Sequence, residues 1–321
     1  MENLDLKDRK ILYELDIDSR QSFRAIGRKV GLSKDVVASR VKKLQEKGII
    51  EYFFVRTNPS FLGYMHMKIY LRLHKITKDK EQELISDLKK SRLIYWLSSL
   101  RGKYDLVVSI YVKNIGDFSQ MYEKILGKWG EYILERNVVI HEKAYIYSKA
   151  YLIPNQKPKQ TVYGEWKEKP VDLDKIDEDL LRYLNSNSRM AIVDIAKQLK
   201  LSIDTIRSRI YNLIKKGLIT GFGTKIDFRK IGNSYHIITL KLQNMNHNKY
   251  KKLEELVKNN CNVIYYIRSI GNHDVELEVE TTNKDELEEL VTSLRNQFLN
   301  EIKDYEILEV IKEHRLSYFP I

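Results

Sequence analysis

Two stretches of the sequence carry polar and basic side chains at a spacing that places them together on one face of a helix. In each stretch apolar residues recur every three or four positions, which leaves the other side chains on the opposite face of a helix. Short polar side chains near the start of such a helix can bond to base edges, and Lys or Arg can neutralise phosphates. We predict DNA contacts from Lys34, Asp35, Ser39, Lys42 and Lys43 in the first stretch, and from Asp204, Thr205, Arg207, Ser208, Tyr211 and Asn212 in the second.

The chemistry of four of these side chains suggests separate roles. Arg207 can bond bidentately to guanine and Asn212 to adenine, each worth roughly 1–3 kcal/mol of base discrimination. Lys42 and Lys43 are typical phosphate contacts, which add affinity without sequence preference. The alternative is that both stretches are the solvated faces of ordinary surface helices.

Arg40 and Arg209 occupy equivalent places, each one residue before an apolar position of its helix. Such an arginine can clamp a phosphate, or it can form an ion pair that ties the helix to its neighbour. The residues alone leave both roles open.

The two stretches belong to a long internal repeat. A shift of 169 positions lays residues 4–50 on residues 173–219 without a gap, and 17 of these 47 pairs are identical. The same shift places Gly63 on Gly232 and Asp105 on Asp274. Chance does not preserve one offset over so long a span, so one gene unit has been duplicated.

Composition limits the class of protein. A chain of 321 residues is too long for one compact core, and 43% hydrophobic with 31% charged residues is typical of a globular protein. The formal net charge of +12 favours an anionic partner such as nucleic acid. The single cysteine, the lack of a signal segment and the lack of a long apolar run favour a cytoplasmic protein without a membrane partner. We find no phosphate loop, metal-spaced Cys/His cluster or nucleophile elbow, so we predict no metal and no cofactor.

The start of each unit has the pattern of a winged helix-turn-helix. Asp5, Ser22 and Ser33 are suited to cap three successive helices, and Gly31 permits the left-handed turn between the second and the third. An apolar and β-branched segment, residues 49–59, then predicts a strand pair or wing. The segment that follows Gly63 changes to alternating strands and two amphipathic helices in the order βαββαβ, which is a ferredoxin-like arrangement.

These features predict an α+β chain in which two winged helix-turn-helix domains alternate with two ferredoxin-like βαββαβ domains. The proline-containing and polar segment between the units has no apolar periodicity, which indicates a semi-extended connector. We place the domains at residues 1–60, 61–153, 172–230 and 231–321, with the connector at residues 154–171.

The chain resembles the Lrp/AsnC (feast/famine) transcriptional regulators, in which one winged helix-turn-helix precedes one βαββαβ domain of the RAM/AsnC type. The resemblance is carried by Asp5 and Asp8 at the start, by the Ser19–Arg20 pair with its repeat at 188–189, by the LS…S-R…L…KGII runs, and by the Gly-Lys-Tyr-Asp turn at 102–105. It covers both halves outside the connector. The chain departs from the family in being double length.

The resemblance implies transcription regulation, dimerisation through the βαββαβ domain and an amino-acid effector near the glycine–aspartate turn. Glycine lets a backbone N–H approach a carboxylate, and aspartate accepts a hydrogen bond from an ammonium. Carried over, the effector residues are Gly102, Tyr104 and Asp105, and in the second unit Gly271, His273 and Asp274, where histidine replaces the tyrosine. The alternative is a tight turn in which the aspartate bonds locally.

The duplication predicts an intrachain pseudo-dimer that carries two unlike DNA-reading helices and therefore recognises two unlike half-sites on double-stranded DNA. Residues 61–160 contain 18 basic and 10 acidic side chains, whereas residues 235–321 contain 11 and 15, so the two βαββαβ domains attract each other. Further assembly of such pseudo-dimers into a homo-oligomer stays open.

Two other classes of function compete with this interpretation. An enzyme is one, because a branch of the same fold, the siroheme decarboxylases, uses histidine and arginine around the middle strands. His273 is present there, but the expected two-histidine arrangement is missing. A DNA-coating architectural protein with little sequence preference is the other, because phosphate contacts alone give affinity.

Overall fold

The computed structural model describes residues 4–165 and 170–319. Each unit begins with three helices and one strand. In the first unit these are α1 (Leu6–Ile17), α2 (Phe23–Val30), α3 (Lys34–Glu46) and β1 (Ile50–Thr57), and in the second they are α6 (Lys175–Ser186), α7 (Ile192–Leu199), α8 (Ile203–Lys215) and β7 (Ile219–Ile226).

The predicted helix caps are confirmed. The side chains of Asp5, Ser22 and Ser33 accept hydrogen bonds from the backbone N–H groups three residues further on, which satisfies donors that a helix start leaves free. Gly31 has a φ of 68°, the left-handed conformation expected between α2 and α3. Lys200, its equivalent in the second unit, takes the same conformation with a φ of 54°.

A βαββαβ domain follows in each unit, as predicted. The first contains β2 (Met65–Leu73), α4 (Lys78–Lys89), β3 (Ile94–Arg101), β4 (Leu106–Val112), α5 (Ile115–Trp129) and β5 (Ile133–Tyr147). The second contains β8 (Ser234–Leu242), α9 (His247–Lys258), β9 (Val263–Gly271), β10 (Val275–Thr281), α10 (Lys284–Gln297) and β11 (Ile302–Leu316).

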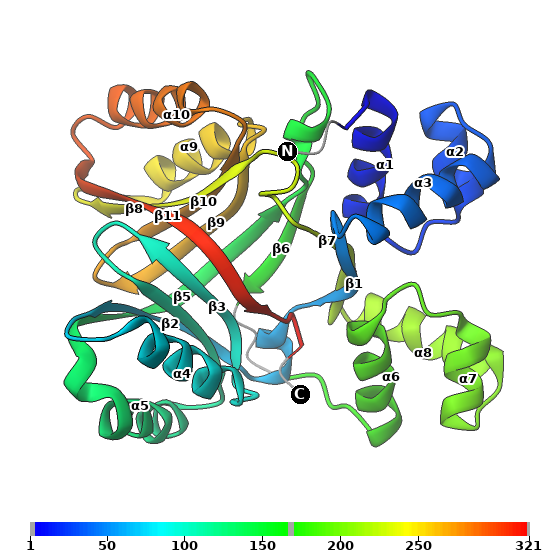
Figure 1. Cartoon of the computed structure of the whole chain (residues 1–321), viewed down its shortest axis with the longest axis horizontal. Coiled ribbons are helices and arrows are strands. Elements are labelled where there is room, and N and C mark those ends of the chain that lie inside the picture. The colour runs from blue at the N-terminus through cyan, green and yellow to red at the C-terminus, as the bar shows by residue number, and fades with distance from the viewer. Residues whose placement is uncertain (1–3, 166–169, 320–321) are drawn as a thin grey trace.

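The two domains join into one closed barrel. Within the domains the strand orders are β5-β2-β4-β3 and β11-β8-β10-β9, and between them β3 pairs with β11 and β5 pairs with β9. Closure leaves neither four-stranded sheet with an unpaired long edge. The helices α9 and α10 cover one side of the barrel, α4 and α5 cover the opposite side, and both helix-turn-helix modules lie to its right in Figure 1.

The strand that follows α3 or α8 pairs with the other unit. Residues of β1 and β7 form an antiparallel two-stranded ribbon, for example Phe53 with Thr224 and Val55 with Phe222. The sequence predicts a strand pair or wing after α3. The structure has the single strand β1 there, and its partner is β7, the equivalent strand 169 positions further along the chain. The ribbon therefore belongs to both modules and lies between them and the barrel (Figure 1).

The predicted semi-extended connector contains one short strand. Residues 154–171 include β6 (Gln160–Glu165), which pairs with β5 at the edge of the sheet. Tyr163 is the reason, because its ring is buried among aromatic side chains and its hydroxyl bonds to Tyr111 at 2.5 Å. The isolated aromatic residue gave no periodic signal in the sequence. Residues 166–169 of the predicted connector lie outside the described residues.

Candidate nucleic-acid interface and ligand sites

The faces of α3 and α8 are oriented as predicted. Val37, Val41 and Leu44 are buried in the first module, and their equivalents Ile206 and Ile210 are buried in the second. The predicted DNA-contacting side chains are exposed, except that Thr205 is half-buried and its hydroxyl is 2.8 Å from that of Ser202. Their contact with DNA stays a prediction. The exposed residues are Lys34, Asp35, Ser39, Lys42, Lys43, Asp204, Arg207, Ser208, Tyr211 and Asn212.

Arg40 and Arg209 form ion pairs, which is one of the two roles left open by the sequence. The Arg40 guanidinium lies 2.7 Å from Asp5 and 2.8 Å from Asp8. Arg209 repeats this contact, at 2.8 Å from Asp174 and 2.7 Å from Asp177. Both α3 and α8 are thereby tied to the start of the first helix of their module.

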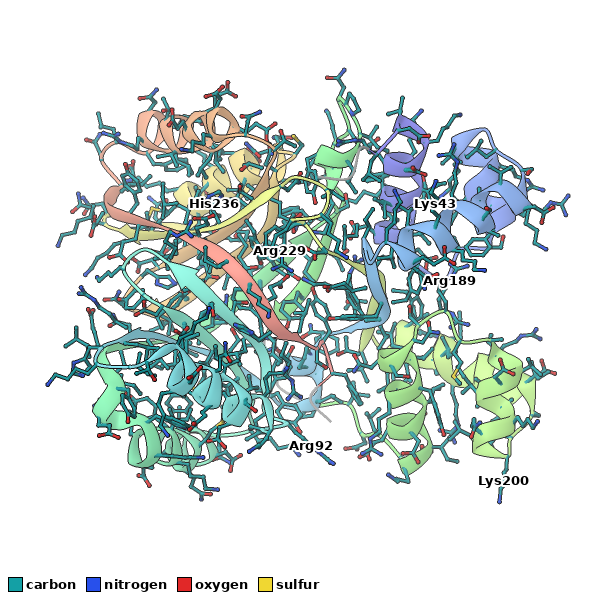
Figure 2. The ribbon with its side chains drawn as sticks, viewed as in Figure 1. Lys43, Arg92, Arg189, Lys200, Arg229 and His236 are labelled. Carbon is teal, nitrogen blue, oxygen red and sulfur yellow. The ribbon has the colours of Figure 1, made fainter. Side chains whose placement is uncertain are left out.

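The two modules meet in a contact with pseudo-twofold symmetry. The hydroxyls of Ser19 and Ser188 are 2.7 Å apart and fully buried. Arg20 donates to the carbonyl oxygens of Ser188 and Met190, and Arg189 donates to those of Ser19 and Gln21. In Figure 2 Arg189 lies between the module that carries Lys43 and the module that carries Lys200. This junction orients α3 relative to α8.

The two glycine–aspartate turns lie where one unit crosses the other. A Cβ at Gly102 would lie 3.0 Å from Leu308 of β11, and one at Gly271 would lie 2.6 Å from the carbonyl oxygen of Val138 of β5. Both glycines therefore permit a close approach of strands from different units.

The aspartates of the turns bond to the backbone of their own unit. The carboxylate of Asp105 accepts the N–H of Leu73 at 2.6 Å, and that of Asp274 accepts the N–H of Leu242 at 2.7 Å. This local bonding is the alternative that the sequence left open, and it occupies one oxygen of each carboxylate. This geometry does not test the predicted effector role of the turn residues, which stays a prediction.

Tyr104 of the first turn and His273 of the second both pack against Tyr70 of β2. The ring of Tyr70 lies 5.4 Å from that of Tyr104 and 5.7 Å from that of His273. The hydroxyl of Tyr70 donates to Glu276 at 2.6 Å, and the His273 imidazole is 3.5 Å from the same carboxylate. The side chains of the two turns are thus brought together through one tyrosine.

A buried ion triad crosses the barrel interior beside this contact. The Lys68 ammonium of the first unit donates to Glu276 and, at 2.9 Å, to Glu278 of the second unit. The burial of Glu278, only partly offset by Lys68, raises the pKa of its carboxyl to about 7. Burying these charges is tolerable only because each has a partner of opposite sign.

Two imidazoles lie unpartnered in the same interior. The rings of His66 and His141 are 5.9 Å apart, and no nitrogen of either ring has a hydrogen-bond partner among the described residues. Burial, with a further contribution from Lys68, lowers the pKa of His66 to about 3. These neighbouring imidazoles come from β2 and β5, and not from the middle strands, where the sequence lacks the two-histidine arrangement expected of the siroheme decarboxylases.

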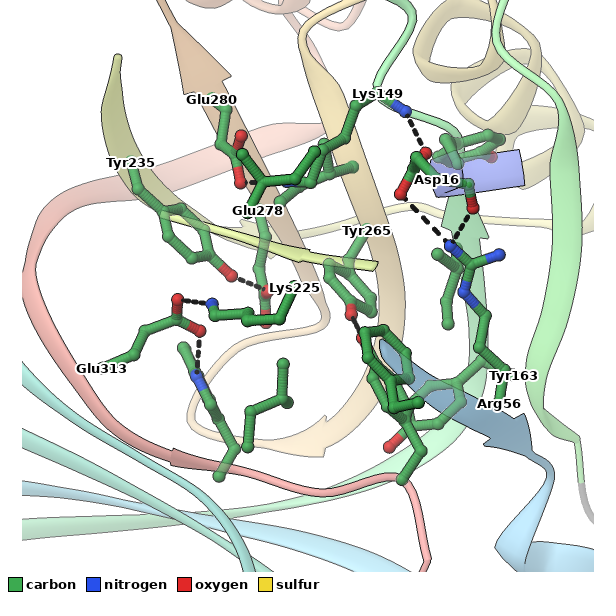
Figure 3. Close-up of a pocket in the computed structure, with 18 of the residues that line it drawn as sticks. Asp16, Arg56, Lys149, Tyr163, Lys225, Tyr235, Tyr265, Glu278, Glu280 and Glu313 are labelled. Atoms are coloured by element: carbon green, nitrogen blue, oxygen red, sulfur yellow. Dashed lines mark hydrogen bonds and ion pairs between the residues drawn. The ribbon is translucent and has the colours of Figure 1, made fainter. Parts of the chain in front are cut away.

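A cavity lies between the barrel interior and the β1–β7 ribbon (Figure 3). Its unfilled volume is about 70 Å³. For comparison, one buried water needs a volume of roughly 10–15 Å³. Lysine–glutamate pairs cross it: Lys225 bonds to Glu313 and Lys149 to Glu280. Arg56 bonds to Asp16 at its side.

The residues of the triad and of the cavity are candidates that no motif of the sequence indicates. A signal was present in the alternating segment VELEVET, which places three glutamates on one face of a strand, and in the lysine of HMKIYLRL. Alternation alone assigns such a face to solvent. Only the closed barrel shows that this face is interior.

Known proteins resemble the chain at the level of sequence. An AsnC-type helix-turn-helix domain matches residues 4–45, and a winged helix-turn-helix DNA-binding domain matches residues 173–220. The HTH-type transcriptional regulator Ptr1 of Methanocaldococcus jannaschii is 41% identical over 123 residues, which are 38% of this chain and 82% of Ptr1. The regulator FL11 of Pyrococcus abyssi is 33% identical over 123 residues, or 38% of this chain and 80% of FL11.

Fold and sequence together define a DNA-binding transcriptional regulator of the helix-turn-helix class. The chain belongs to the Lrp/AsnC family, whose unit it contains twice. The siroheme decarboxylase NirDL shares the arrangement of the whole chain, with a TM-score of 0.63, 97% of this chain and 92% of NirDL covered, and 11% identity. That likeness shows the fold alone. Among the described residues no helix is long and apolar enough to cross a membrane.

Proposed function

We propose that the chain regulates transcription in the cytoplasm as an intrachain pseudo-dimer that reads two unlike half-sites of double-stranded DNA. The observation that supports this most is the symmetric Ser19–Ser188 junction, which joins two modules whose outward residues differ. Lys42 and Lys43 of α3 have Tyr211 and Asn212 as their counterparts on α8. Helices that differ in this way recognise different base edges.

Selection of bound DNA from a random pool tests this proposal. The expected product is a site with two dissimilar halves, roughly one helical turn of 34–36 Å apart. A perfect palindrome would contradict the two unlike reading helices. Equal affinity for selected and random duplexes at physiological salt would instead identify a low-specificity architectural protein.

The second part of the proposal is that a free amino acid modulates DNA binding. Membership of the Lrp/AsnC family and the position of Gly102, Tyr104, Asp105 and their counterparts at the inter-unit contact support it. Repeating the selection with and without a mixture of free amino acids tests it. A change of affinity or of the selected site is expected, and identical results would refute the amino-acid response.

A second candidate function is binding or conversion of a tetrapyrrole. The full-length likeness to NirDL, which has also been crystallised with an iron-uroporphyrin III analogue, and the two unpartnered imidazoles favour it. The small volume of the cavity opposes it. Titration with haemin distinguishes the candidates, because ligation by His66 or His141 would produce a shifted haem absorption band that is lost in the His66→Phe/His141→Phe variant.

A further inference from the structure

We propose that the second module recognises its half-site through thymine methyl groups, which Ile203 and Tyr211 of α8 contact in the major groove. The inference rests on the proposed function and deepens it, because it names the base feature that distinguishes the second half-site from the first. It follows from the exposed apolar side chains of α7 and α8, from the residues that replace them in the first module, and from their places on α8.

Apolar side chains gather on the exposed surface of α7 and α8. Their exposed fractions are 55% for Val193 of α7, and 39%, 64% and 45% for Ile203, Tyr211 and Ile214 of α8. They do not belong to the buried side of α8, which is formed by other residues such as Ile206. A single exposed apolar residue is common, but several on two neighbouring helices indicate a surface that binds a partner.

The first module has charged or polar side chains at the same places. The shift of 169 positions pairs Arg24 with Val193, Lys34 with Ile203, Lys42 with Tyr211 and Gln45 with Ile214. All four residues of the first module are exposed. Cations at these places suit phosphates, which position a protein on DNA but carry no sequence information. Apolar side chains cannot bond to phosphate, so at these places the second module contacts another part of the duplex.

Two of the apolar side chains lie where a recognition helix meets base edges. Ile203 is the first residue of α8, and the N-terminal residues of a recognition helix contact bases in the major groove. Arg207 and Tyr211 follow at intervals of four residues, so the three side chains form one stripe along the helix. Ile214 continues this stripe but lies in the last turn of α8, further from the bases.

The thymine methyl group is the apolar feature of the major groove. It is the part of a base pair that apolar side chains contact, and it lies in the same groove as the two guanine acceptors that suit an arginine. Contact with the methyl group removes apolar surface of both partners from water. Because Arg207 lies between Ile203 and Tyr211, the expected half-site has thymines beside a guanine.

A protein partner is the other kind of occupant for an apolar surface. The stripe is interrupted by Arg207, whose guanidinium lies 3.1 Å from the carboxylate of Asp204, and Ser208 is exposed beside it. An apolar protein surface would bury this charged pair, which is costly. Base edges offer acceptors and donors next to the methyl groups. The polar residues of the same surface therefore favour DNA.

Uracil substitution tests the methyl contact, because uracil differs from thymine only in lacking the C5-methyl group. The full chain is titrated with its selected site by fluorescence anisotropy, and the thymines of one half-site at a time are replaced by uracil. The second half-site is the one in which Arg207→Ala relaxes the base preference. There we expect affinity to fall about fourfold for each methyl group contacted, and in the first half-site to stay within about twofold.

The salt dependence gives a second readout of the same titrations. A methyl contact releases no counterions, whereas phosphate contacts do. We therefore expect the ratio of affinities for the thymine and uracil duplexes to be the same at low and at high salt, although both affinities fall.

Variants of α8 test the two residues. Ile203→Ala and Tyr211→Ala should each bind the thymine duplex about fourfold more weakly than the unmodified chain. The double variant should bind thymine and uracil duplexes equally. Ile214→Ala is the matched control, because it removes an exposed isoleucine of the same stripe in the last turn, and it should keep the ratio of the unmodified chain.

The outcomes separate this inference from the proposed function. Equal losses from uracil in both half-sites, a second half-site without thymine, or a ratio kept by the double variant would overturn the inference and leave two unlike half-sites standing. A chain that selects no sequence would overturn both. If the double variant keeps the ratio but loses a self-association that light scattering detects in the unmodified chain, the apolar surface is an interface between chains instead.

Discussion

At the scale of single residues, a cationic side chain has a different role on the surface and in the interior of the barrel. Arg207 is exposed, and its 3.1 Å ion pair with Asp204 is a surface pair of little energetic weight, so its guanidinium is free to turn toward DNA. Lys68 has the same charge, but its burial between two carboxylates commits it to the interior.

Replacing single side chains of the DNA-reading helices should separate base reading from phosphate binding. Arg207→Ala should cost roughly 1–3 kcal/mol at the selected site and relax the preference at one base position. Lys43→Ala should weaken binding to all duplexes alike and lower the salt slope by about one. Fluorescence anisotropy over a range of salt concentrations measures both effects. Lys124→Ala on α5 is the control, and an equal effect of Lys124→Ala and Lys43→Ala would refute the assignment.

His66 should make the stability of the protein depend on pH. Its neutral ring packs at 4.7 Å from that of Tyr111, and its pKa of about 3 in the folded chain lies below the ordinary value of 6.5. The unfolded chain therefore takes up a proton first, and stability is lost as the pH falls from 6.5 toward 3. Between pH 7 and pH 5 we expect the unmodified chain to lose about 2 kcal/mol more than His66→Phe. Parallel urea titrations at both pH values measure the difference, and identical losses would contradict the neutral burial of this ring.

At the scale of elements, the turns and the ribbon matter because they join the two units. Gly271 ends β9 and lies opposite Val139 in the pairing of β9 with β5. Its φ of 143° and the nearby backbone of β5 both exclude a side chain. The glycine that resembles part of a ligand site in the sequence is therefore required by the close approach of two strands.

A pair of glycine substitutions tests this requirement. Gly271→Ala should destabilise the chain by at least about 2 kcal/mol, because the new Cβ would lie 2.6 Å from a carbonyl oxygen at a strained φ. Gly127→Ala on α5 meets nothing within 4 Å and should stabilise the chain by up to about 1 kcal/mol. Thermal unfolding measures both, and equal melting temperatures would show that β5 moves away freely.

At the scale of the whole molecule, the ion triad favours pairing between unlike units. Lys68 corresponds to Ile237 in the second unit, whereas Glu276 and Glu278 correspond to Val107 and Ser109 in the first. Two copies of the first unit would bury lysines without partners, and two copies of the second would bury glutamates. Either arrangement is penalised by several kcal/mol per stranded charge.

Replacing each residue of the triad by the residue at the equivalent position of the other unit tests whether the triad favours pairing between unlike units. Lys68→Ile should destabilise the chain by roughly 3–5 kcal/mol, because it leaves two buried carboxylates without a cation. Adding Glu276→Val and Glu278→Ser should restore much of that loss. Lys90→Ile removes an exposed lysine 3.6 Å from Asp87 and should cost less than about 1 kcal/mol.

Urea unfolding measures the stability of these variants, and light scattering shows whether the restored variant forms pairs between chains. If the single Lys68→Ile variant is as stable as the unmodified chain, the triad does not favour pairing between unlike units.

The sequence by itself determined the duplication, the order of the helices and strands, the caps at Asp5, Ser22 and Ser33, and the outward face of α3. These features depend on residues within a few positions of one another, where periodicity and capping act directly. The tertiary structure alone decided that β1 pairs with β7, that β6 joins the sheet, and that Lys68 meets Glu276. Pairing between strands more than 100 residues apart is selected by the free energy of packing the two units together, in the β1–β7 ribbon as in the barrel. No local pattern in the sequence indicates which polar strand face will lie inside the closed barrel.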